Sequence, residues 1–390
     1  MLSAVAGSLI TVTSLTFSLT VVTLQLASSQ FSPRLLRTFT RDRFVHITLA
    51  LFLATFSYAL TVLRTVRNDG TDQPGSVPQV SVTTAFVLAL ASVVALVLFL
   101  AHLAREIRVE TMLDTVHEDA RTTVRTQLAE LDPQPAPASH TPAPQPPADA
   151  VRLSVRSSGF LVRIDEDDIL AAAVAAGAVL MVDRSPGSFV VAGTPVGASW
   201  AHSAPIDPER RAELADRVAA ALHTGVERTQ VQDVAFGLRQ LTDVAVKALS
   251  PGINDPTTAN YALGHTSALL CELTGRDLGP RLLRDEAGTV RVVLRRPGFA
   301  ELLDLAVAQP RRCGAADPSV LARLAALLEE LAWSARTPQQ RDAVTGQLGR
   351  LRVTAAEQDF DDAEQVDLRR LTDRVERALA GDWTPERTSE

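Results

Sequence analysis

The stretch from Leu2 to Leu26 reads LSAVAGSLITVTSLTFSLTVVTLQL, and it decides where this chain resides. It is apolar and exceeds the roughly 20 residues that a helix needs to cross the hydrocarbon core of a bilayer. No charged residue precedes Arg34, yet eleven of residues 1 to 29 are Ser or Thr. A signal peptide would begin with basic residues and have a shorter apolar part. The stretch therefore predicts a membrane-spanning helix that is rich in hydroxyl groups.

The small and polar residues of this segment share one stripe of the predicted helix. They recur at steps of four and three, with Val21 or Val22 filling the one gap, and comprise Gly7, Thr11, Ser14, Ser18, Gln25 and Ser29. In hydrocarbon such a stripe must face another helix or water in a conduit. The six residues are therefore candidates for either a packing seam or the lining of a pore, and the pattern leaves both open.

Two further uncharged segments, Phe44 to Leu63 and Val80 to Leu103, complete a predicted membrane domain of three transmembrane helices over residues 1–103. The loop charges predict its orientation, because cytoplasmic loops carry an excess of Lys and Arg. Four arginines and one aspartate lie in the first loop, against two of each in the second: Arg34, Arg37, Arg41, Arg43 and Asp42, then Arg64, Arg67, Asp69 and Asp72. We therefore expect a multi-pass protein of the bacterial inner membrane, with everything after Leu103 in the cytoplasm.

The helical pattern continues beyond the third span. Residues 104–131 predict an amphipathic stalk helix, with apolar residues recurring among charged ones at Ile107, Leu113, Val116, Val124 and Leu128. Residues 132–149 contain seven prolines among small and polar side chains, which is typical of a linker. The linker marks a domain boundary.

The second half of the chain predicts a cytoplasmic α+β domain. Residues 150–204 form a small β-rich, barrel-like subdomain, with strands at Gly159–Ile164, Ala178–Val182 and Phe189–Ala198. Residues 205–380 are mainly helical and form a layer, including a helix opened by Asp207 and another from Arg228 to Leu249, and residues 381–390 are a disordered tail. The expected fold class is an α-helical membrane domain followed by this α+β domain.

The most distinctive string of the second half is SPGINDPTTA, residues 250 to 259. Pro251 ends a helix, Gly252 permits a left-handed turn, Asn254 or Asp255 caps, and Pro256 starts the next helix. The string predicts a corner between two helices. It is also a candidate binding corner, since backbone amides at a helix start can hold an anion, with Ser250, Gly252, Asn254 and Asp255 as the candidate residues.

This string, together with ERTQVQDVAFGLRQLTDVAVKAL before it and SLTFSLTVVTLQLASSQFSPRLL in the membrane region, resembles the bacterial predicted-membrane-protein family called domain of unknown function 2254 (DUF2254). The resemblance extends from Met1 to at least Gly275. It implies an integral membrane protein with a cytoplasmic domain and no transferable catalytic residues. Members usually carry one more hydrophobic segment in front, and the odd number of spans, which leaves Met1 outside, also suggests that this first segment is missing.

Composition excludes several functions. A net charge of −7 and no basic stripe argue against a nucleic-acid partner. Cys271 and Cys313 are too few and too isolated for a disulfide framework or a thiolate metal site. The acidic run from Asp165 to Asp168 lacks the spacing of a calcium loop and is better explained as a helix cap. With no motif for a nucleophile, phosphate loop, metal or cofactor, we expect no enzyme, no metal and no cofactor.

Two functions remain in view. The first is a homo-oligomeric channel or transport-like protein for a small ion or ligand, whose cytoplasmic domain gates or senses. The second is a membrane-tethered sensor or scaffold that binds a ligand or protein at the corner of residues 250–259. The expected partners are the lipid bilayer and other copies of the chain.

Overall fold

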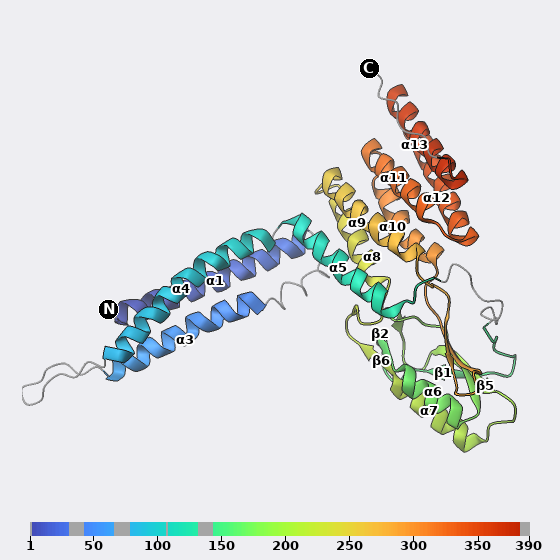
Figure 1. Ribbon diagram of the computed structural model, residues 1–390, viewed down its shortest axis with the longest axis horizontal. Helices are drawn as coiled ribbons and strands as arrows, with labels where there is room; N and C mark the ends of the chain where they lie inside the picture. The colour runs from blue at the N-terminus through green and yellow to red at the C-terminus, as the bar shows by residue number, and fades with distance from the viewer. Residues whose placement is uncertain (1, 31–42, 66–78, 107, 132–142, 383–390) are drawn as a thin grey trace, which may run out of the picture. The chain divides into compact units, whose positions relative to one another are not determined.

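The computed structural model describes residues 2–30, 43–65, 79–106, 108–131 and 143–382. The chain divides into two compact units, Met1–Met112 and Leu113–Glu390, which we call the membrane unit and the α+β unit (Figure 1). Most of the charges used to predict orientation lie outside the described residues, as does the greater part of the predicted linker and tail. The cytoplasmic placement of the second unit therefore stays a prediction.

The membrane unit contains three helices, α1 (Leu2–Gln30), α3 (Arg43–Thr65) and α4 (Gln79–Glu106). All three are long and apolar enough to cross a membrane, as predicted. Helix α3 packs against both α1 and α4. Its buried residues follow a four-three spacing typical of knobs-into-holes packing, at Thr48, Phe52, Thr55, Ala59 and Val62. On α4 the buried residues recur every seven positions, at Ala85, Ser92 and Phe99.

The predicted stalk contains helix α5 (Val109–Gln127). Four residues of its predicted apolar face are buried, namely Leu113, Val116, Val124 and Leu128, whereas Ile107 lies outside the described residues. This face packs within the α+β unit. Ala120 lies directly against Gly237, and a Cβ added to Gly237 would lie only 2.1 Å from the Ala120 Cβ. The backbone of residues 129–131 also pairs with residues 275–277, as in the 2.8 Å bond from Leu131 N to Gly275 O. The helix is thus a docked part of the α+β unit.

The described strands of the α+β unit form two open sheets. One has five strands in the order β1 (Val151–Ser154), β5 (Pro195–Ala201), β3 (Ala178–Val182), β8 (Val290–Leu294), β7 (Arg281–Arg284). The other has three, in the order β4 (Phe189–Val190), β2 (Gly159–Ile164), β6 (Leu222–Gly225). Only β3 and β8 run parallel among these pairs, with Leu180 opposite Val292.

The barrel-like closure predicted for residues 150–204 is not found in these sheets. Its strands separate instead, because β2 pairs with β4 and β6 while β3 gains a parallel partner, β8, from far downstream in the chain. The strand predicted from Phe189 to Ala198 is interrupted at Gly193, whose φ of +76° places it in the left-handed region. It becomes β4 and β5, which belong to different sheets.

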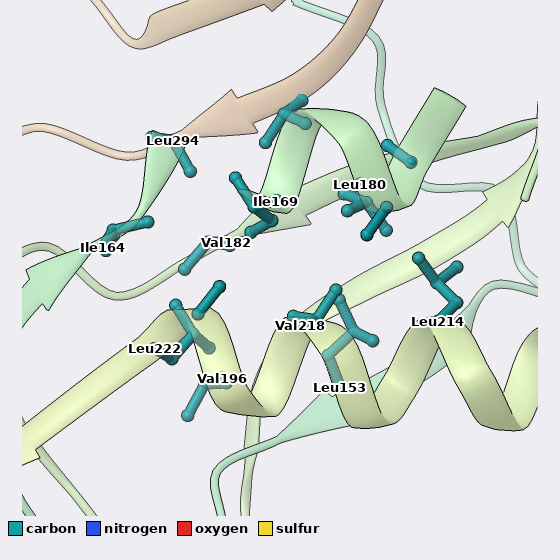
Figure 2. Close-up of a cluster of buried hydrophobic side chains, with 14 of the residues drawn as sticks. Leu153, Ile164, Ile169, Leu180, Val182, Val196, Leu214, Val218, Leu222 and Leu294 are labelled. Carbon is teal, nitrogen blue, oxygen red and sulfur yellow. The ribbon is translucent and has the colours of Figure 1, made fainter. Parts of the chain in front are cut away.

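Helices α6 (Glu166–Ala175) and α7 (Pro208–Ala221) pack on each other and on the strands. Figure 2 shows Ile169 of α6 and Leu214 and Val218 of α7 pointing into one cluster with side chains of the sheets. The caps of both helices agree with the prediction, since Asp165 accepts from the backbone N–H of Asp168 and Asp207 from that of Arg210. This apolar core joins the two sheets.

The helical layer begins with α8 (Phe236–Ala248) and α9 (Pro256–Thr274), and after β7 and β8 it continues through α10 (Phe299–Cys313), α11 (Pro318–Ser334), α12 (Pro338–Ala356) and α13 (Asp362–Ala380), yellow to red in Figure 1. Helix α9 packs between α8 and α11. The prediction that a helix begins at Arg228 is wrong, because α8 begins at Phe236. Residues 230–235 form turns instead.

Candidate functional site

The predicted seam lies on the face of α1 that the rest of the membrane unit leaves uncovered. Gly7, Thr11, Ser14, Ser18 and Gln25 are all exposed, and the side chain of Ser29 lies outside the description. The buried stripe of α1 is a different one, formed by Leu2, Ala6, Leu9, Thr16 and Thr23. With 3.6 residues per turn, Thr16 lies roughly 160° around the helix from Ser18. Most of the seam therefore lies opposite the intramolecular contact, while Ser14 also borders an apolar hollow lined by Leu49, Ala50 and Leu53 of α3.

Hydroxyl groups of α1 are largely satisfied within the helix. Thr11 donates to Gly7 O at 3.1 Å, and Thr13, Thr20 and Thr23 donate to the carbonyl four residues earlier at 2.7 to 2.9 Å. Such bonds remove most of the cost of placing a hydroxyl in an apolar medium. Gln25 is different, because its amide carries two donors and an acceptor and cannot be satisfied in this way. Among the described side chains of the seam, Thr11 makes such a bond, so the Ser14 and Ser18 hydroxyls and the Gln25 amide are left for a neighbouring helix or for water.

A polar contact that the sequence analysis missed joins α3 to α4. The Ser92 hydroxyl donates to the Thr55 hydroxyl at 3.2 Å, and both groups are buried. Thr55 in turn donates to Leu51 O at 2.8 Å. In the sequence, Ser92 lies seven positions after Ala85 and seven before Phe99. This heptad spacing is the signal that would have found it. Small hydroxyl residues thus hold this unit together as well as marking its uncovered face.

The corner after α8 has the predicted shape with one correction. Asn254, rather than Gly252, adopts the left-handed conformation, with φ of +49°. The backbone hydrogen bonds require the left-handed conformation at this residue. The amides of Ile253 and Asn254 both donate to Ser250 O. The next amide, Asp255 N, donates back to Ala248 O at 2.9 Å. Asn tolerates this conformation better than most residues. The Ser250 hydroxyl donates to Lys247 O at 2.6 Å and is thus also part of the turn.

The cap of α9 is Asp255. Its carboxylate accepts from Thr258 N at 3.0 Å, and hydrogen bonds from the Thr258 side chain and backbone lower the pKa of this carboxyl. A carboxylate of the protein therefore occupies the position where an anion would meet the start of α9. The exposed residues of the corner are Pro251, Gly252, Ile253, Asn254 and Thr257.

A buried ion pair lies just before α8. The guanidinium of Arg228 donates to Asp233 Oδ2 from Nε at 2.9 Å and from a terminal nitrogen at 2.6 Å, and it lies over the Phe236 ring. Asp233 Oδ1 accepts from Ala235 N at 3.1 Å. Burial raises the pKa of the Asp233 carboxyl, and Arg228 opposes that shift. The sequence analysis placed both residues in a helix from Arg228 to Leu249 and did not find this pair.

Helix α5 is held to α9 by a second set of charged contacts. Arg121 and Arg125 donate to the two carboxylate oxygens of Glu272 at 2.9 and 2.8 Å. The same two helices also meet through histidines, His117 of α5 and His265 of α9. Their rings lie edge to face with centroids 5.4 Å apart. Burial, and then the nearby His117, lower the pKa of His265. Among the described residues, no three His, Cys, Asp or Glu side chains come together in a way that could hold a metal ion.

Three helices able to span a bilayer, followed by an α+β unit, define a membrane protein with a large extramembrane part. The chain belongs to the family described as predicted membrane protein (DUF2254), which it matches over residues 1–330. It is 40% identical over 362 residues to the uncharacterized proteins Rv1290c of Mycobacterium tuberculosis (strain ATCC 25618 / H37Rv) and Mb1321c of Mycobacterium bovis. Each match covers 93% of this chain and 68% of the relative. No solved structure matches the chain. The expected family membership is thus confirmed.

Proposed function

We propose that this protein is a homo-oligomeric channel or transport-like protein of the inner membrane, with the α+β unit in the cytoplasm as its gating or sensing part. The observation that carries the proposal is the seam, Gly7 to Gln25, which is polar and yet lies outside the buried stripe of α1. Lipid is a poor neighbour for this face, above all for Gln25. A second copy of α1 presents the same small and hydroxyl side chains and allows close approach of the two backbones.

Disulfide cross-linking tests the oligomer. In a background that lacks the natural cysteines, Ser18→Cys is expected to give a covalent dimer in membranes. Thr16→Cys is the matched control, because it lies two residues away at the same depth but is buried on the opposite face. Equal cross-linking of both variants, or a strictly monomeric purified protein, would contradict the proposal.

Ion flux from liposomes separates a conduit from a packing seam. If the gathered seams line a pathway, Ser14→Leu with Ser18→Leu should abolish flux while the cross-linking of a Thr11→Cys variant persists. Absence of flux for every ion tested in the natural protein would leave oligomeric packing as the only role of the seam and would overturn transport.

A sensor or scaffold role is the second candidate, and the exposure of Ile253 and Asn254 at the corner favours it. Asn254→Ala with Asp255→Ala is expected to abolish capture of a partner or ligand without unfolding the chain. Asp317→Ala is the matched control, because Asp317 caps α11 just as Asp255 caps α9 and is followed by proline as well. Unchanged capture by the corner variant would remove this candidate.

A further inference from the structure

A small cavity of about 30 Å³ lies where separate parts of the α+β unit meet. It is lined by the end of α5 at Gln127, the end of β2, the start of α6, the turn at Ser185, the residues before α8 and the segment after β8 at Arg295 and Arg296. A space of this size admits a compact ion or the end group of a larger molecule. Figure 2 shows Ile164 and Leu294, which form part of its wall, at one edge of the apolar core.

Several polar groups around the cavity are already committed. Gln232 exchanges two hydrogen bonds with the backbone of Ile164, at 2.7 and 3.0 Å. Asp233 is held by Arg228, and Arg295 pairs with Glu301 at 2.8 Å. Glu166 pairs with Arg281 at 3.1 Å. These groups shape the cavity but do not need a ligand.

Three donors remain uncommitted within the described part of the chain. The Arg296 guanidinium has no ion pair or hydrogen bond there, and neither the Gln127 amide nor the Ser185 hydroxyl has a side-chain hydrogen bond. All three residues are half-buried, and they come from three separate elements. Donors that line one cavity without hydrogen bonds to the protein are candidates for holding a ligand.

Arg296 also supplies an electrostatic reason for a ligand. Burial, and then repulsion from Arg281, lower the pKa of its guanidinium. Glu166 and Asp277 act in the opposite sense, but Glu166 is engaged by Arg281 and Asp277 accepts from Gly279 N at 2.9 Å. A half-buried cation without a partner is unfavourable, and an anion with several acceptor oxygens would offset that cost.

We propose that this cavity binds a phosphate group, with Arg296 as the charged ligand and Gln127 and Ser185 as neutral donors. The planar fork of arginine matches two oxygens of a phosphate, and the remaining oxygens can accept from the amide and the hydroxyl. The group is either a free phosphate ion or the phosphate of a small organic ester. Because Gln127 ends α5, an occupied site would fasten that helix to the sheet. The site does not depend on the proposed transport function.

Equilibrium binding to the full chain in detergent tests the site, with labelled inorganic phosphate as one probe and glycerol 3-phosphate as the other. Saturable binding of either supports the proposal, and the probe that binds more tightly identifies the form of the group. Arg296→Gln should weaken binding at least about tenfold, because it removes the charged hydrogen bonds. Arg295→Gln is the matched control: it lines the same cavity but is paired and exposed, so less than about threefold change is expected.

Folding is checked separately. Without phosphate, Arg296→Gln should be at least as stable as the natural protein, because it removes an unpaired half-buried charge. Ser185→Ala gives a second and smaller loss of binding. Equal binding by Arg296→Gln and the natural protein, tighter binding of acetate than of phosphate, or no saturable binding of either probe would overturn the proposal.

Discussion

Replacing Asp233 by alanine is expected to be among the most damaging single changes in the α+β unit. The Asp233 side chain is 3% exposed and that of Arg228 is 19% exposed, so the change removes a buried carboxylate that accepts two hydrogen bonds from a half-buried guanidinium. It also removes the acceptor of Ala235 N at the start of α8. Breaking a buried ion pair by removing one partner costs about 3–5 kcal/mol of unfolding free energy. For a domain of this size the expected fall in melting temperature is roughly 6–20 °C.

Tryptophan fluorescence is the appropriate assay, because the tryptophans, Trp200, Trp333 and Trp383, all belong to the α+β unit. Denaturant unfolding of the full chain in detergent therefore reports that unit. Asp216→Ala is the matched control: Asp216 also pairs with an arginine at 2.9 Å, but its side chain is 76% exposed. Its loss should cost less than about 1 kcal/mol.

A double variant separates the cost of a half-buried Arg228 charge from the cost of losing the contacts of Asp233. Arg228→Met with Asp233→Ala removes both charges and should recover most of the stability that Asp233→Ala alone loses, because an apolar side chain can occupy the buried site. If Asp233→Ala costs less than about 1 kcal/mol, or if the double variant is as unstable as the single one, the account of this pair is wrong.

Three further changes give separate tests. Gly187→Ala should destabilise the α+β unit by about 2 kcal/mol or more in the same fluorescence assay, since Gly187 has a φ of +89° and its Cβ would lie 2.0 Å from Asp233 Oδ2; an unchanged midpoint would refute this. The pKa of His265 is lowered in the folded state, so protonation favours unfolding: stability should be full above about pH 6.5 and fall as the pH drops below it. His265→Gln should flatten that fall, and an unchanged pH dependence in this variant would refute the assignment. Ser92→Ala removes the hydrogen bond to Thr55 of α3. It should lower the free energy of unfolding of the membrane unit by about 0.6 kcal/mol, measured by circular dichroism during unfolding in detergent. A loss above about 2 kcal/mol would refute the assignment of this bond as an ordinary neutral hydrogen bond between membrane helices.

Much of the helix chemistry was predictable because it is local. The three spans follow from uninterrupted apolar length, and the caps at Asp165, Asp207 and Asp255 follow from residues a few positions apart. The predicted strands Gly159–Ile164 and Ala178–Val182 have the bounds of β2 and β3. Periodicity and turn residues carry this information within about ten residues of sequence, which is the range over which propensity rules operate.

The failures arise where pairing partners are distant in sequence. The start of α8 was placed too early, since residues 228–235 look helical by composition but are held in turns by the Arg228–Asp233 pair and by the bonds of Gln232 to the Ile164 backbone. The barrel-like closure predicted for residues 150–204 is not found in the sheets, because β3 pairs with β8, which follows far downstream. The left-handed residue of the corner was assigned to Gly252, whereas the carbonyls of Ala248 and Ser250 require it at Asn254.

The sequence by itself determined that this protein belongs in a membrane, because transfer of a long uncharged segment into hydrocarbon is a property of that segment alone. It also determined that one stripe of α1 is polar. Only the tertiary structure decided that this stripe is left exposed. The residues of α1 that become buried are those that pack against the side chains of α3. The same holds for Arg296: its charge is visible in the sequence, but its lack of a partner depends on how the pairs around it form in space.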